Sequence, residues 1–202
     1  MDPRFKPPFT MLIAGGSGCG KTTFVERLIK HLPDMITQPQ DSVIWCYNQW
    51  QDAYTRLSNY NVTFREGLPD EWHTGPPRLV IIDDLMCETD KRITELFTVG
   101  SHHKNISVIF IVQNVFEKSL RTVSLNAHYL VLFKNPRDTS QILHLAKQIF
   151  PGQSNYMQAA YKDATSEPHT YLLVDLKQDT PENARLRTAI FPGETQIVYV
   201  PK

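Results

Sequence analysis

The sequence predicts an α/β fold, in which a mostly parallel sheet is flanked by helices and extended toward the C-terminus by antiparallel strands. Three observations support this prediction. Short apolar runs rich in β-branched residues recur along the chain, as buried parallel strands require. Amphipathic segments of helical period lie between these runs. Beyond about residue 165 the pattern changes to further strand-like runs.

Five of the apolar runs are short enough to be buried strands of the parallel sheet. The predicted strands are residues 9–14, 42–47, 79–82, 108–112 and 128–133. Three later runs, two of them separated by a Pro-Gly turn, predict a small antiparallel addition to the sheet. These runs are residues 170–176, 186–191 and 196–200.

Three helices are predicted between the strands. The first begins at about Lys21 and ends before Pro33, because its apolar residues recur on one face and proline forbids continuation. The second spans residues 89–99, with Gly100 as its C-terminal stop. The third spans residues 139–149, where a Phe-Pro-Gly sequence ends it.

The composition is that of one folded domain. Hydrophobic residues make up 41% of the 202 residues, and Lys+Arg and Asp+Glu both number 21, so the formal charge is zero. Because such a chain lacks the broad basic field of a protein that grips nucleic acid alone, any DNA contact must be local or built by assembly. We expect a single domain over residues 1–202, with a core at about 9–150 and the strand addition at about 165–202.

Neither the cysteines nor the N-terminus indicates export. The three cysteines have no paired short spacing, so neither a disulfide framework nor a zinc cluster is predicted. The N-terminus has no apolar signal core, and no apolar run approaches the ~18 residues of a membrane helix. We therefore expect a protein that is not secreted and has no membrane segment.

A phosphate-binding loop lies between the first predicted strand and the first helix. Its sequence matches G-x-x-x-x-G-K-[ST] at every required position. The glycines let successive N–H groups close around phosphate oxygens at a helix N-terminus that already favours anions. Lys21 should reach the β- and γ-phosphates of ATP, Thr22 should bind Mg²⁺, and Thr23 should lie near the α-phosphate. The predicted nucleotide-binding residues are Gly15, Gly16, Ser17, Gly18, Cys19, Gly20, Lys21, Thr22 and Thr23.

Two carboxylates follow the third apolar run, in the manner of a Walker B strand. Asp83 is predicted to hold the water shell of Mg²⁺ between the β- and γ-phosphates, because ligands collect beyond the carboxyl ends of parallel strands. Asp84 is the predicted base that accepts a proton from, or orients, the attacking water. Since adjacent side chains on a strand point to opposite faces, Asp84 can act only if the chain turns there; otherwise it is a solvated loop residue.

Polar residues also end the next strand. Gln113 directly follows the apolar run and is the predicted sensor of the γ-phosphate or the attacking water, while Asn114 suits that role or a turn. A GTPase is a poor alternative. The acidic strand lacks Asp-x-x-Gly, and Pro136 stands where the base-reading Asn-Lys-x-Asp motif has lysine.

With these motifs in order, the chain resembles the viral DNA-packaging ATPases of the FtsK-HerA superfamily, the poxvirus-type group also found in Polinton-like viruses. The segments that carry the resemblance span about residues 9–149: they are 15–23, 79–86, 108–116, 124–129 and 133–138. The last two segments are the most particular to this group. The part of the chain beyond them adds little.

The resemblance implies a P-loop NTPase fold of the ASCE, RecA-like type, with residues 9–150 as a motor core. It implies a homo-oligomeric ring that hydrolyses ATP to drive double-stranded DNA into a preformed capsid at its portal vertex. Such a protein acts inside the infected cell, in cytoplasm or nucleus, or travels with the virion. Sites of this kind take an arginine from the neighbouring subunit. Arg121 is the first candidate and Arg137 the second, each with the alternative of a surface or DNA-facing cation.

Alternatives stay open at this level. A small-molecule or nucleoside kinase shares the phosphate loop but needs an acceptor pocket and usually an arginine-rich lid, and no clear lid is seen. A replication helicase or helicase loader of the AAA+ type would carry a C-terminal helical domain, against which the strand-like tail argues. A nucleotide-gated scaffold without turnover is disfavoured by Asp84. The segments 91–92 and 102–104 are the nearest to a basic surface, either lining a ring pore or forming a solvated helix face.

Overall fold

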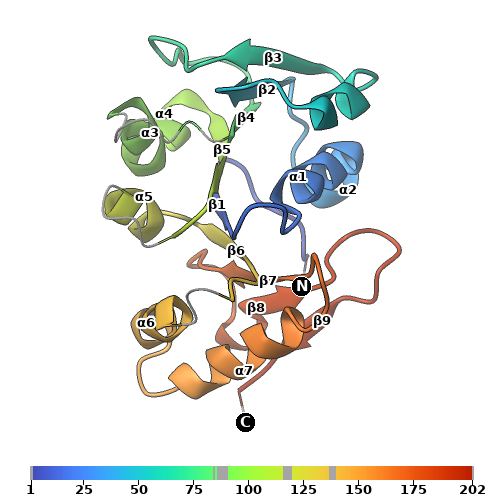
Figure 1. Ribbon diagram of the computed structural model, residues 1–202. Helices are drawn as coiled ribbons and strands as arrows, with labels where there is room; N and C mark the ends of the chain where they lie inside the picture. The colour runs from blue at the N-terminus through green and yellow to red at the C-terminus, as the bar shows by residue number, and fades with distance from the viewer. Residues whose placement is uncertain (1, 84, 86–90, 116–119, 137–139, 202) are drawn as a thin grey trace.

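A single twisted sheet with helices on both faces forms the protein in a computed structural model, which describes residues 2–83, 85, 91–115, 120–136 and 140–201. Among these residues, nine strands pair in the order β3-β2-β4-β5-β1-β6-β7-β8-β9. The first six in that order are parallel, and β7, β8 and β9 add on antiparallel. The predicted fold class is confirmed, including the antiparallel extension (Figure 1).

The strands fall close to their predicted positions. The parallel strands are β1 Thr10–Ala14, β2 Ser42–Tyr47, β3 Val62–Glu66, β4 Arg78–Asp83, β5 Ile106–Val112 and β6 Tyr129–Phe133. The antiparallel strands are β7 Tyr171–Asp175, β8 Leu186–Thr188 and β9 Ile197–Tyr199. Only β3 was not predicted. Its side chains alternate between half-buried and exposed, because it is an edge strand with few apolar residues.

Helices connect the strands. They are α1 Lys21–Lys30, α2 Leu32–Met35, η1 Asp52–Leu57, α3 Lys91–Glu95, η2 Leu96–Gly100, α4 Ser101–Lys104, α5 Arg121–Leu125, α6 Ser140–Ile149, α7 Ser154–Ala164 and η4 Glu182–Ala184. The first and third predicted helices are confirmed as α1 and α6. α7 was missed, because polar residues interrupt the apolar face that it buries.

The predicted stop at Gly100 is wrong. The helical path from α3 passes through a π-helical turn at η2 and continues in α4 to Lys104. Gly100 keeps helical backbone angles and is buried, so its lack of a side chain serves close packing. Asn105 takes the left-handed conformation, with φ 55°, and ends the helix.

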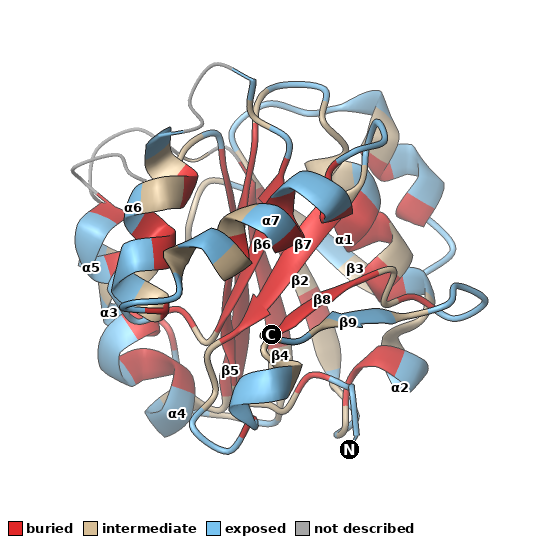
Figure 2. Cartoon of the chain, turned by 90° about the horizontal axis from the view of Figure 1, so that it is seen from below, coloured by how far each residue is buried: buried red, intermediate tan, exposed pale blue. Residues whose placement is uncertain are grey.

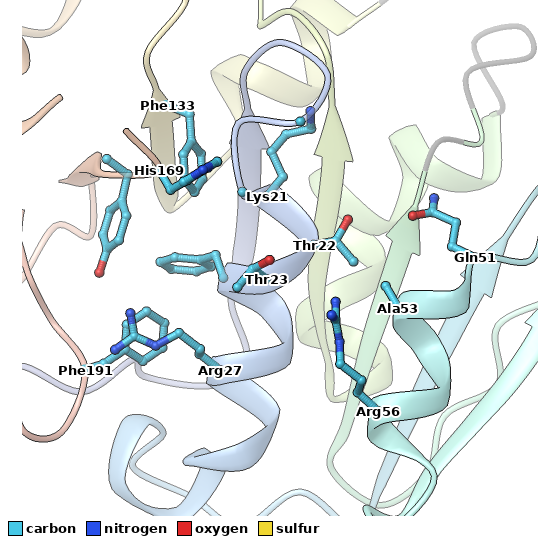
Figure 3. Close-up of a pocket in the computed structure, with 14 residues that line it drawn as sticks. Lys21, Thr22, Thr23, Arg27, Gln51, Ala53, Arg56, Phe133, His169 and Phe191 are labelled. Carbon is cyan, nitrogen blue, oxygen red and sulfur yellow. The ribbon is translucent and has the colours of Figure 1, made fainter. Parts of the chain in front are cut away.

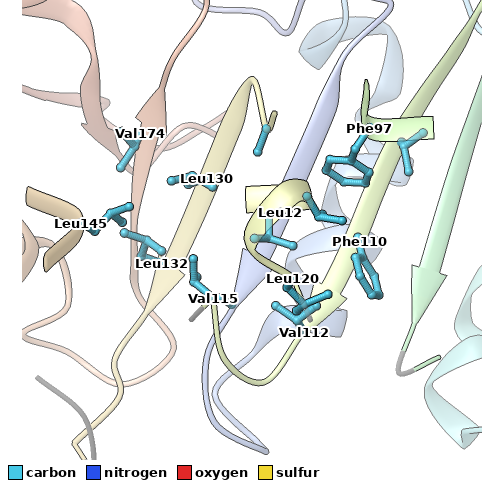
Figure 4. Packing of buried hydrophobic residues seen from close by; sticks show 14 of the residues in the cluster. Leu12, Phe97, Phe110, Val112, Val115, Leu120, Leu130, Leu132, Leu145 and Val174 are labelled. Atoms are coloured by element: carbon cyan, nitrogen blue, oxygen red, sulfur yellow. The ribbon is translucent and has the colours of Figure 1, made fainter. Parts of the chain in front are cut away.

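Each face of the sheet has its own hydrophobic core. On one face Leu12 and Phe110 pack with side chains from α3, α5, α6 and α7 (Figure 4). On the other face Met11 and Ile13 pack beneath α1, α2 and η1. The alternation of neighbouring β1 residues between the two cores is the period of a strand buried on both sides. Figure 2 shows the burial concentrated in the central strands and the inner faces of the helices.

Within the described residues, no helix has the length and apolarity needed to cross a membrane.

Candidate functional site

The phosphate loop occupies the turn from β1 into α1, as predicted. Gly20 is the residue before the helix and has φ 107°, a conformation that an L side chain rarely adopts. A side chain at Gly15 would clash with its neighbours, because a Cβ there would lie 2.6 Å from Cys19 Sγ and 2.7 Å from Phe133 Cβ. The loop therefore needs glycine at both positions to keep its path.

The N-terminus of α1 and Lys21 face the same space. The first turn of the helix contains no acidic residue, so no side chain of its own offsets the positive end of the helix dipole. The Lys21 ammonium donates hydrogen bonds to the carbonyl oxygens of Gly15 at 2.7 Å and Gly16 at 3.0 Å. These contacts hold a positive charge over the loop, within reach of a phosphate that enters it.

Asp83 ends β4 and is almost fully buried, with 3% of its surface exposed. The hydroxyl of Tyr54, from η1, donates a hydrogen bond of 2.9 Å to its Oδ2 atom. A buried donor that hydrogen-bonds a carboxylate in this way restricts it to one orientation. The sequence did not link Tyr54 to this site, because nothing near it in the chain connects it to a strand that begins more than 20 residues later.

The order of the strands places Gln113 between the phosphate loop and Asp83. Strand β5 lies between β1 and β4, with Val112 paired to Ala14 and Ile111 paired to Asp83. Gln113 follows Val112 directly and is exposed. The prediction that its strand tip faces the phosphate-binding edge therefore agrees with the structure.

A small cavity of about 140 Å³ gathers the residues predicted to act at the γ-phosphate end. Its lining residues are Ser17, Gly18, Lys21, Thr22, Gln51, Asp83, Ile111, Val112 and Gln113. One hydroxyl and one carboxylate, from Thr22 and Asp83, form a donor set that suits Mg²⁺, which keeps several waters and binds few protein oxygens. The cavity thus brings together the predicted metal ligands and the predicted sensor.

A larger cavity of about 510 Å³ continues from the loop along α1 (Figure 3). Gly18, Lys21, Thr22 and Gln51 line both cavities. The larger one is wide enough for more than a triphosphate, and its lining also includes Thr23, the predicted neighbour of the α-phosphate.

Two polar residues at the cavity were missed by the sequence analysis. Gln51 precedes η1, and Arg56 lies within it. Arg56 donates a hydrogen bond of 2.8 Å to Glu26, a buried carboxylate of α1. In Figure 3 its side chain extends toward Thr22. The local sequence around η1 carries no phosphate-binding motif, so only the packing of η1 against α1 reveals these residues.

Of the two predicted arginine candidates, the structure describes Arg121 alone. Arg121 is the first residue of α5, is exposed, and lines neither cavity. Arg137 and the predicted base Asp84 lie outside the described residues. Their roles stay predictions.

Cys19 is half-buried within the loop. Burial raises the pKa of its thiol, and the nearby Lys21 only partly opposes this effect. The thiolate form is therefore disfavoured, which fits a packing role better than a reactive one.

Two basic residues of the segments 91–92 and 102–104 are engaged in local contacts. Arg92 lies 3.7 Å from Asp70 and donates to two backbone carbonyls, while Lys104 pairs with Glu95 at 2.7 Å. These contacts favour the interpretation of a solvated helix face over that of a free basic patch.

Comparison with protein families gives one match. The family model described as RNA helicase matches residues 11–124, which is more than half of the chain and runs from β1 to α5. This segment contains the phosphate loop, Asp83 and Gln113. A search of curated proteins finds no match to the sequence.

Solved structures share the fold at low sequence identity. The genome packaging NTPase B204 from Sulfolobus turreted icosahedral virus 2, solved in complex with ATP-gammaS, superposes with a TM-score of 0.55 at 14% identity. The match covers 100% of this chain and 99% of that one. The cytoplasmic domain of the type VII secretion ATPase EccC from Thermomonospora curvata superposes with a TM-score of 0.53 at 11% identity. The match covers 96% of this chain but only 25% of EccC.

The fold is therefore that of the P-loop NTPases, and the predicted resemblance to viral packaging ATPases is confirmed at the level of the fold.

Proposed function

The chain belongs to the RNA helicase family, and from this premise we propose that it is an ATPase that moves along nucleic acid. More narrowly, we propose a double-stranded DNA translocase that packages a viral genome. The observation that carries the ATPase proposal is the small cavity at the phosphate loop, which Lys21, Thr22, Asp83 and Gln113 line together. A nucleotide site requires these side chains in one place, although they come from three separate elements.

Each residue has a separate role in the transfer of the γ-phosphoryl group to water. Loop N–H groups and Lys21 hold the β- and γ-phosphates, while Thr22 and Asp83 hold Mg²⁺. When bound, Mg²⁺ supplies positive charge that offsets the charge on the phosphate oxygens. Gln113 orients the attacking water, and Asp84, the residue after Asp83, is the proposed base.

The narrower proposal rests on the extent of one structural match. The likeness to the packaging NTPase B204 runs over nearly the whole of both chains, whereas EccC is matched over a quarter of its length. We propose by extension a homo-oligomeric ring, with duplex DNA and a capsid portal vertex as partners. Such a ring acts within an infected cell or in the virion. An arginine from a neighbouring subunit, Arg121 or Arg137, would complete each site.

The test is the steady-state ATPase rate per subunit across protein concentration, with and without duplex DNA. We expect a rate that rises with protein concentration and with duplex DNA, and that is lost in Lys21→Ala. His144→Ala, a change of an exposed residue on α6, serves as a matched surface control. A Lys21→Ala variant that hydrolyses ATP at the native rate contradicts the phosphate-loop assignment.

A second candidate function is that of a helicase. It is favoured by the family match, which covers the phosphate loop and the strands around it. The two functions differ in the nucleic acid that stimulates hydrolysis. Single-stranded RNA or DNA that accelerates turnover more than a blunt duplex does supports the helicase, and the reverse order supports the duplex translocase.

A further inference from the structure

The larger cavity has a wall that the phosphate chemistry does not use. This wall faces away from Asp83 and is built from the end of β6, the start of β7, the outer face of α1 and the segment after β8. We call it the base alcove. Its residues are Thr23, Arg27, Phe133, His169, Tyr171 and Phe191.

The sheet order gives the direction in which a nucleotide extends from the loop. Strands β5 and β4 lie on one side of β1, and they carry Gln113 and Asp83 to the γ-phosphate end. Strands β6 and β7 lie on the other side of β1 and carry Phe133 and Tyr171. A triphosphate whose γ end lies at Asp83 therefore directs its nucleoside toward the base alcove. Figure 3 shows Phe133, His169 and Phe191 on one side of α1, and Gln51, Ala53 and Arg56 on the other.

The floor of the alcove is aromatic. Phe133, Tyr171 and Phe191 line it and are otherwise buried, with 2%, 6% and 2% of their surfaces exposed. The Phe133 carbonyl accepts a hydrogen bond of 2.9 Å from Tyr161 of α7, which secures this end of β6. The Phe133 and Tyr171 rings are inclined by 50° to each other and the Tyr171 and Phe191 rings by 79°, so the floor offers both faces and edges of rings. Aromatic contacts of both kinds are favourable, so this apolar floor suits a nucleobase.

The rim of the alcove carries polar groups that are held in place. Arg27 stacks on the Phe191 ring, with 4.1 Å from its Cζ atom to the ring centroid, and pairs with Glu194 at 2.6 Å. His169 is exposed and has φ 63°, and a Cβ on Gly20 would lie 3.4 Å from its Cβ atom. The imidazole therefore stands directly beside the phosphate loop, at the point where the nucleoside would leave it.

We infer that the base alcove binds the nucleobase and ribose of the nucleoside triphosphate, with His169 and Arg27 contacting the base from the rim. The inference rests on the proposed function, since it assumes a nucleotide in the phosphate loop. It assigns the C-terminal antiparallel strands a share in substrate recognition, in addition to their place in the sheet.

The experiment compares two ligands, ATP and inorganic tripolyphosphate, each with Mg²⁺, by calorimetric titration of the full chain. The two differ in that only ATP has a nucleoside. The variants are His169→Ala and Arg27→Gln, because these rim side chains are accessible and their loss leaves the buried aromatic floor in place. Lys21→Ala is the comparison variant, which should weaken the binding of both ligands. His144→Ala is the surface control.

We expect each rim variant to weaken ATP binding about 5- to 150-fold, the range for lost stacking on a nucleobase, with tripolyphosphate binding changed by less than about twofold. Three results overturn the inference alone: unchanged ATP affinity in both rim variants, an equal loss for both ligands, or native protein that binds tripolyphosphate as tightly as ATP. Native protein that binds neither ligand overturns the proposed function, and the inference with it.

Discussion

Tyr54→Phe tests whether a buried tyrosine orients the predicted metal ligand. The change removes one oxygen atom, whose 2.9 Å hydrogen bond to Asp83 is made where both residues are at most 3% exposed. The ring that remains keeps its packing against Trp45 and Phe64, with centroids 5.1 and 5.5 Å away. Any effect therefore reports on the hydroxyl and its carboxylate partner.

The magnitude follows from the charge and burial of the acceptor. A hydrogen bond to a charged group contributes about 1.5–3 kcal/mol to stability. At roughly 2–4 °C per kcal/mol for a chain of this size, the variant should unfold roughly 3–12 °C below the native protein. Loss of a donor that orients a metal ligand typically lowers the affinity for the metal by about 10- to 100-fold. The Mg²⁺ concentration needed for half-maximal ATP binding should therefore rise by about the same factor.

Two measurements separate the possible roles. Thermal unfolding gives the stability term, and ATP titrations at graded Mg²⁺ give the metal term. The control is Tyr47→Phe, which removes a hydroxyl from a half-buried tyrosine in the same ring cluster. If Tyr54→Phe lowers the unfolding temperature but leaves the Mg²⁺ requirement unchanged, the hydroxyl is structural only. If neither quantity changes, the reasoning is refuted.

Three further predictions follow from buried groups and from the loop. Arg187→Met should cost about 3–5 kcal/mol at pH 7, because it leaves Asp175 buried without its 2.5 Å partner. Burial already raises the pKa of Asp175, so the folded variant retains a proton that the unfolded chain releases. Urea unfolding should therefore show a larger loss of stability at pH 8 than at pH 5. Equal losses of stability contradict this. His128 has a pKa lowered to about 4 by burial and by Lys177, so the unfolding free energy should fall by about 1 kcal/mol, after allowance for partial exposure, as pH drops from 6.5 to 4. His128→Gln should flatten that dependence. Gly20→Ala, at φ 107°, should cost about 1–2 kcal/mol and abolish ATP binding in titrations; retained affinity would show that the loop tolerates a side chain there.

Local sequence was sufficient for the parallel core and for the phosphate loop. Strands such as β5, predicted at residues 108–112 and found at Ile106–Val112, are buried on both faces and so appear as continuous apolar runs. The loop is recognisable because its glycines and Lys21 are neighbours in the chain and must be so for the backbone to surround a phosphate. The helix stop at Gly100 failed because this glycine lies inside a π-helical turn, where a Cβ would lie 3.1 Å from the Glu95 carbonyl oxygen of the same helical path.

The sequence by itself determined the position of the predicted phosphate loop and of the central strands, which are buried on both faces. It did not determine which strands are neighbours. That depends on crossover connections, and the placement of β5 between β1 and β4 is what brings Gln113 beside Asp83. The same holds for Tyr54, Arg56 and His169, whose partners at the site lie far from them in the chain. Only tertiary packing brings such residues together, because contacts between distant segments leave no periodic pattern in the local sequence.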